Sequence, residues 1–74
     1  MKVNVLSQQF NIETFECIGE MRTEEINTQT NQLFQDCKNL MDVRRRYESF
    51  WNDMGKNKNT PIKVLVKTIE CIKE

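Results

Sequence analysis

The 74-residue chain contains no histidine, no alanine, only two glycines and a single proline. Without histidine, Ser-His and Cys-His catalytic pairs are impossible within the chain, and a four-ligand zinc site would need carboxylates. Gly19 and Gly55 stand far apart, so they do not form a glycine-rich phosphate-binding loop. These absences lead us to expect a non-enzymatic protein that holds no metal and no cofactor.

Long hydrophobic runs are also absent. No stretch approaches the ~20 apolar residues of a membrane helix, and residues 1–6 carry one lysine beside too short an apolar run for a secretory signal. We therefore expect a cytoplasmic protein with one small domain over residues 1–74, since this length leaves no room for two cores. Cys17, Cys37 and Cys71 are odd in number and not closely spaced, which predicts reduced, partly buried thiols.

The charges balance, but their distribution is uneven. Residues 1–36 hold two basic and six acidic groups, a net charge of −4, and residues 37–74 hold nine basic and five acidic groups, a net charge of +4. Such a chain can pair its charges internally or with a second copy.

Eight asparagines and no alanine indicate an AT-rich coding sequence, as in many phages and low-GC bacteria. Small proteins of mobile elements often act by binding a host protein.

Two segments in the first third of the chain favour strands. Residues 2–6 are short and rich in β-branched side chains, and residues 13–21 show an apolar alternation of period two that Ile18 interrupts once. A helix beginning near Asn11 is the competing interpretation of the second segment. We expect strands over about 2–6 and 13–21.

A long amphipathic helix is the strongest signal. Thr23 resembles an N-cap followed by acidic residues, and apolar side chains then recur at helical spacing from Ile26 to Met54, before Gly55. A helix over about 24–54 would be ~45 Å long. Because a compact domain of this size is only about 30 Å across, the helix would overrun its own core and need another chain to cover it.

The last segment, residues 61–73, carries two conflicting signals. Thr60 and Pro61 form a helix-start pair, whereas six β-branched residues between Ile62 and Ile72 favour a strand, which we expect. The predicted fold is therefore α+β, with an antiparallel sheet of two or three strands packed on one long amphipathic helix. An all-α three-helix bundle is the alternative.

The apolar arc of the predicted helix is wider than one small sheet can cover, and its surplus is aromatic. Tyrosine, tryptophan and arginine dominate binding hot spots, so we expect this end of the helix to bind a host protein, a second copy of the chain, or both. A small phage or mobile-element regulator or inhibitor that acts by occlusion fits this pattern. The expected partner-binding residues are Val43, Arg44, Tyr47, Phe50, Trp51 and Met54.

Two other functions remain open. A basic patch could bind nucleic acid, and its residues would be Arg44, Arg45, Arg46, Lys56 and Lys58. The three arginines fan over about 200° of a helix, and Asp42 is placed to pair with two of them, so nucleic acid is the less favoured partner. A structural homo-oligomer with helices packed along the stripe is the third possibility. Arg44 itself is expected to lie along the core beside Glu48 or to set the register of an interface.

Overall fold

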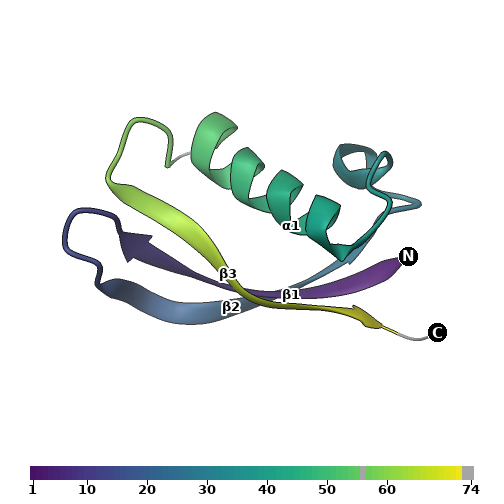
Figure 1. The fold of residues 1–74 in the computed structure, drawn as a ribbon, viewed down its shortest axis with the longest axis horizontal. Coiled ribbons are helices and arrows are strands. Elements are labelled where there is room, and N and C mark those ends of the chain that lie inside the picture. Colours follow the sequence, from purple (N-terminus) through teal and green to yellow (C-terminus); the bar gives the residue numbers. More distant parts are fainter. Residues whose placement is uncertain (56, 73–74) are drawn as a thin grey trace.

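The computed structural model describes residues 1–55 and 57–72 and has one helix packed on one face of a three-stranded antiparallel sheet (Figure 1). The strands are β1 (Lys2–Asn11), β2 (Cys17–Asn27) and β3 (Ile62–Ile72), in the order β2-β1-β3. Between β2 and β3 lie the 3₁₀ turn η1 (Gln32–Phe34), the helix α1 (Leu40–Ser49) and the π-helical turn η2 (Phe50–Met54) that extends it. The α+β class is confirmed, and the three-helix alternative is wrong.

The strands are longer than predicted, and the second is displaced. The first extends to Asn11, and the second begins at Cys17 because residues 13–16 belong to the connecting turn. In that turn the Asn11 side-chain oxygen accepts hydrogen bonds from the N–H groups of Glu13 and Thr14, at 2.8 and 3.3 Å. The C-terminal strand is confirmed over Ile62–Ile72, while residue 73 lies outside the described residues.

The helix is much shorter than predicted. Residues 24–27 belong to β2, and the helix begins at Leu40. Asn39 starts it by accepting a hydrogen bond from the Asp42 N–H at 2.9 Å, and the Asp42 carboxylate accepts one from the Lys38 N–H at 3.0 Å. Asparagines also interrupt the preceding segment, because the side chains of Asn27 and Asn31 accept from nearby N–H groups and hold the chain in turns.

The core lies between α1 and the sheet. Along β1 the side chains alternate, so that Val3, Val5 and Ser7 are buried while the residues between them are half-buried. Together α1 and η2 span 15 residues, or ~22 Å, which fits within the 39 Å long axis of the molecule. The expectation that the helix overruns its domain is therefore wrong. The buried hydrophobic residues are Val3, Val5, Ile26, Phe34, Val43, Tyr47, Val64 and Val66.

Side chains of the helix cover the outer edge of β3. The Asn52 amide donates to the Val64 carbonyl at 3.0 Å and accepts from the Val64 N–H at 2.7 Å. The Glu48 carboxylate accepts from the Val66 N–H at 3.2 Å. These bonds satisfy backbone groups that would otherwise be open to another strand. The helix then ends at Gly55, where an added Cβ would lie 3.0 Å from the carbonyl oxygens of Phe50 and Trp51.

Candidate protein-binding surface

The helix divides the predicted partner-binding residues into a buried and an accessible group. Val43 is 0% exposed and Tyr47 is 5% exposed, because both face the sheet and pack in the core. These two positions correct the prediction: a residue in the core is not free to contact a partner. Phe50 and Trp51 are half-buried, and Met54 is 66% exposed at the end of η2.

The accessible aromatic side chains support one another. The rings of Phe50 and Trp51 meet edge to face with their centres 5.5 Å apart and their planes at 79°. Trp51 also lies against Tyr47, with ring centres 6.4 Å apart and an angle of 59°. Since Tyr47 is fixed in the core, it holds one side of the indole while the other side remains partly exposed.

A groove of about 110 Å³ runs between the helix and β2, and we call it the aromatic groove. The helix supplies one wall, β2 forms the floor, and η1 supplies the second wall. Arg22 and Thr23 line an adjoining hollow of about 90 Å³, which shares Glu24, Tyr47 and Trp51 with the groove. The principal lining residues of the aromatic groove are Glu24, Ile26, Leu33, Phe34, Phe50 and Trp51. Its rim is thus apolar or aromatic on two sides and acidic at the β2 floor.

Tyr47 anchors the helix under this groove. Its hydroxyl shares a buried hydrogen bond of 3.2 Å with the Ser7 hydroxyl on the central strand. Burial raises the pKa of Tyr47 above its usual value; the bond to Ser7 partly opposes the rise, and the nearby Glu24 carboxylate adds to it. The phenol is therefore held in its neutral, hydrogen-bonded form at the base of the groove.

The raised pKa of Tyr47 predicts a loss of stability at alkaline pH. The neutral phenol is favoured in the folded state, so its contribution is complete below the unfolded pKa of about 10 and disappears as the pH rises through the folded-state value. Ultraviolet titration of this single tyrosine should give a higher midpoint in the folded chain than in urea. Tyr47→Phe should lose stability less steeply in that range, and equal titration midpoints would contradict the assignment.

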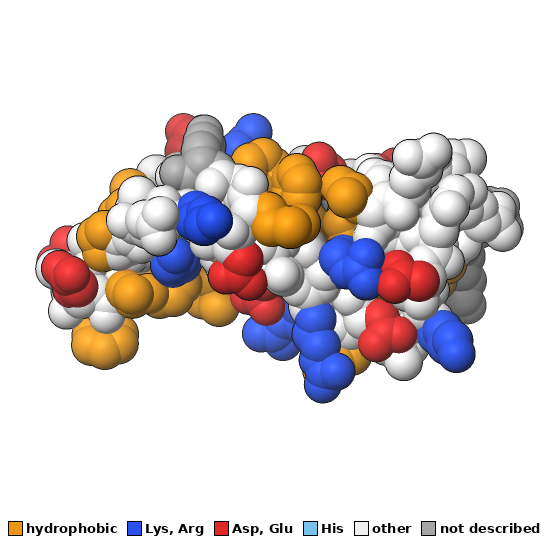
Figure 2. All heavy atoms as spheres, turned by 90° about the horizontal axis from the view of Figure 1, so that it is seen from above, with side chains coloured by type: hydrophobic (Ala, Val, Ile, Leu, Met, Phe, Trp, Pro, Cys, Tyr) orange, Lys and Arg blue, Asp and Glu red, His pale blue; other side chains and the backbone are white. Residues whose placement is uncertain are grey.

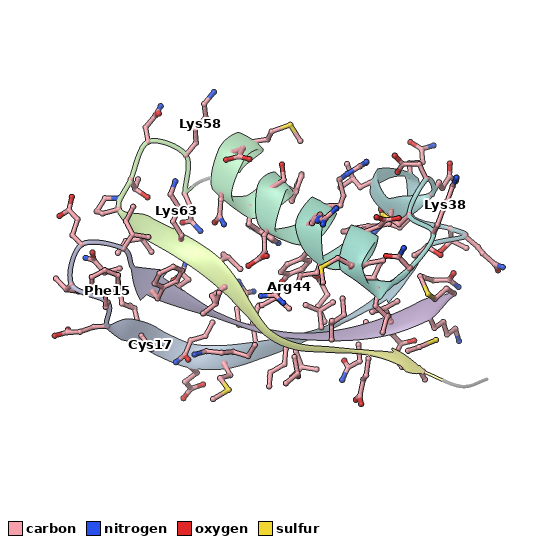
Figure 3. All side chains as sticks on the ribbon, in the orientation of Figure 1. Phe15, Cys17, Lys38, Arg44, Lys58 and Lys63 are labelled. Atoms are coloured by element: carbon pink, nitrogen blue, oxygen red, sulfur yellow. The ribbon has the colours of Figure 1, made fainter. Side chains whose placement is uncertain are left out.

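The predicted basic patch is divided by internal pairing. Arg44 lies between α1 and β3 (Figure 3). Its Nε is 3.4 Å from the Glu48 carboxylate, so the predicted position beside Glu48 is the one observed. Arg45 is exposed, Lys58 lies in the loop before β3, and Lys56 is outside the described residues. These arginines therefore do not form one continuous basic face.

Arg46 fastens η1 to the helix. Its guanidinium donates to the Leu33 carbonyl at 2.8 Å and to the Asp36 carboxylate at 2.7 Å, which together we call the Arg46 clamp. The hydrogen bond from Arg46 holds the pKa of Asp36 below its usual value. The Asp42 carboxylate, which was expected to pair with Arg45 or Arg46, accepts a hydrogen bond from the Lys38 N–H before the helix instead.

A wider hollow of about 370 Å³ lies beside the Arg46 clamp, but it is open and polar. Cys37 lines it, and burial raises the pKa of this thiol, which keeps it protonated and a poor nucleophile. Cys37 is half-buried as expected, whereas Cys17 and Cys71 are exposed. Within residues 1–55 and 57–72, no cluster of three or more potential ligands could hold a metal ion.

The hairpin that joins β1 to β2 carries an apolar cluster that the sequence did not indicate. Phe15 sits at its tip with 84% of its surface exposed and a positive φ of 62°, which is uncommon for a residue other than glycine. Ile12, Ile18 and Met21 are exposed nearby. Figure 2 shows hydrophobic side chains at this end of the molecule, apart from those beside the helix. The apolar alternation over residues 13–21 predicted a strand, but it did not predict that both faces of this segment would be exposed.

Comparison of the chain with protein-family models, with curated proteins and with solved structures finds no match. In the part of the chain that the structure describes, no helical segment is long and apolar enough to span a bilayer. Function must therefore be inferred from the surface itself.

Proposed function

We propose that the protein is a non-enzymatic protein-binding module whose partner inserts apolar side chains into the aromatic groove. The observation that carries this proposal is the half-buried pair of Phe50 and Trp51 beside the groove, in which Trp51 also packs against the buried Tyr47. Rigid aromatic side chains at the edge of a groove make large contacts while losing little conformational entropy. Leu33 on the opposite wall extends the apolar contact.

The charges around the groove favour a protein over a nucleic acid. Glu24 and Glu25 border it and would repel phosphates, while Arg44 and Arg46 are engaged with acidic groups of the same chain. A regulator or inhibitor of a host protein, acting by occluding the partner's own surface, is the role that we propose for this module. It needs neither a cofactor nor a metal.

Trp51→Ala is expected to abolish capture of such a partner. Truncating a central hot spot weakens binding by about 2 kcal/mol or more, or about 30-fold. Wild-type protein and the variant would be used as matched baits in a host extract treated with nuclease, with washes at low and high salt. Met41→Ala, which removes an exposed side chain elsewhere on the helix, is the control.

The proposal expects a protein that wild type and Met41→Ala retain, that Trp51→Ala loses, and that high salt does not release, because apolar contacts are little affected by screening. Equal retention by all three baits would contradict the role of the groove. Loss of the captured material with rising salt would instead favour the basic residues.

A further inference from the structure

The two edges of the sheet differ sharply. β1 is central, so β2 and β3 each have one edge without a neighbouring strand. Glu48 and Asn52 cover the edge of β3 at Val66 and Val64. In β2, the nine consecutive residues Cys17–Glu25 are all exposed. Natural proteins protect open edges from pairing with another chain. This fold covers the edge of β3 at Val64 and Val66, whereas residues 17–25 of β2 are exposed throughout.

The backbone groups that β2 presents outward follow from its pairing with β1. The Thr28 N–H donates to the Met1 carbonyl at 2.9 Å, and Ser7 lies opposite Arg22 in the same register. Hydrogen-bonded pairs occur at every second position of an antiparallel ladder. Arg22 and Glu24 therefore direct their N–H and C=O groups toward β1. Thr23, which stands between them, directs its backbone groups away from the sheet.

We propose that two copies of the chain pair antiparallel through β2, with Thr23 opposite Thr23 of the second copy on the two-fold axis. Outward backbone groups then bond to each other, as the ladder requires. Arg22 comes opposite Glu24 of the second copy, and Glu24 comes opposite Arg22. Met21 comes opposite Glu25. This register therefore forms two symmetric pairs of opposite charge and places no like charges directly opposite within the strand centre.

The neighbouring registers are less favourable. Sliding the partner strand by two residues keeps the outward groups paired but centres the pairing on Glu24 or on Arg22. Each then lies opposite its own copy, and like charges directly opposite are destabilising. A slide of four residues centres the pairing either on Glu25, again opposite its own copy, or on Met21, within the stretch opposite Gln8 where the ladder between Ser7 and Gln9 is irregular. Gly19 has a φ of +70° there, so this part of the edge is not regularly extended. The Thr23 register is centred within the regular part, residues 22–27.

The pairing does not depend on the proposed function, but it changes the shape of that site. A two-fold axis perpendicular to the sheet keeps both helices on the same face of the combined sheet. The aromatic grooves of the two copies would then face each other across the paired β2 strands. The β2 strand of the second copy would then extend the sheet beneath the hollow that Arg22 and Glu24 line in a single chain.

Charge exchange tests this register directly. Arg22→Glu and Glu24→Arg each replace two attractive cross-strand pairs with two repulsive ones, so each variant should raise the dimer dissociation constant about tenfold or more. The double variant Arg22→Glu/Glu24→Arg restores opposite charges and should return to within about threefold of wild type. Sedimentation at a series of concentrations gives the dissociation constants. Circular dichroism checks that each variant remains folded, as expected for exposed positions.

A cysteine pair provides a second test that does not depend on charge. In a background with Cys17, Cys37 and Cys71 changed to serine, Thr23→Cys should form a covalent dimer on mild oxidation. Its Cα atoms would be about 5.5 Å apart, within the range for a disulfide. Glu25→Cys is the control, because in this register it lies four residues, or about 13 Å, from its own copy.

Each outcome supports or overturns the proposal. A concentration-dependent dimer that both single variants dissociate and the double variant restores supports it. Wild-type protein that remains monomeric into the high micromolar range overturns it, as does a dimer that persists in both single variants. Failure of the double variant to restore the dimer, or equal cross-linking at positions 23 and 25, overturns the register. Partner capture is measured in a separate experiment with the Trp51→Ala bait. A failure of the proposed function therefore does not change the interpretation of the dimerisation results.

Discussion

Alanine at Tyr47 is expected to remove about 3–5 kcal/mol from the free energy of unfolding, the usual loss for truncating a buried aromatic side chain. A domain of 74 residues has a total stability of roughly 4–11 kcal/mol, so this one change should leave the chain at the limit of folding. The ring packs in the core under Trp51, and its hydroxyl bonds to Ser7. Chemical unfolding followed by circular dichroism would measure the loss.

Met54→Ala is the matched control for Tyr47→Ala. It truncates a large apolar side chain that the sequence assigned to the same surface but that is exposed on η2. Its effect should lie within about 0.5 kcal/mol of wild type. If the two variants lost similar stability, the helix could not be oriented as described, with Tyr47 toward the sheet.

The second large effect is expected for Asn52→Ala, at about 2–3 kcal/mol of unfolding free energy. The change leaves both the N–H and the C=O of Val64 without their partner, and each unsatisfied, partly buried group is unfavourable by about 1 kcal/mol or more. Asn52→Asp should fall between alanine and wild type, because a carboxylate accepts from the Val64 N–H but cannot donate to its carbonyl.

Asp53→Ala serves as the control for Asn52. It lies next to Asn52 on η2, is exposed, and its carboxylate accepts a 3.1 Å hydrogen bond from Ser49. Its loss should change stability by less than about 0.5 kcal/mol. Urea midpoints followed by the fluorescence of the single tryptophan would rank the variants. Equal midpoints for Asn52→Ala and Asp53→Ala would show that the edge of β3 does not need this cover.

The fold class was predictable because the local signals were consistent in most segments. β-branched residues marked the first and last strands, and the apolar stripe marked the helix from Leu40 onward. The start of the helix was not predictable from Thr23 and the glutamates after it. That segment fits a strand equally well, and its conformation is decided by the distant pairing of Ile26 with Val3.

The candidate site was only partly predictable for a related reason. Phe50 and Trp51 are half-buried beside the aromatic groove, while the sheet buries Val43 and Tyr47, which the sequence predicts for the same surface. The wide apolar arc depends on a predicted helix about twice as long as the 15 residues of α1 and η2. The strand order, which places β1 at the centre and leaves β2 exposed, depends on pairings between distant segments. No local pattern in residues 17–25 indicates it.

The Arg46 clamp has a mechanical consequence for the aromatic groove. One wall of the groove is η1 and the other is the helix, and Arg46 joins them through the Leu33 carbonyl and the Asp36 carboxylate. The two walls are therefore linked to each other directly, as well as through the sheet below them. A groove whose walls are already linked loses less conformational entropy when a partner side chain binds in it.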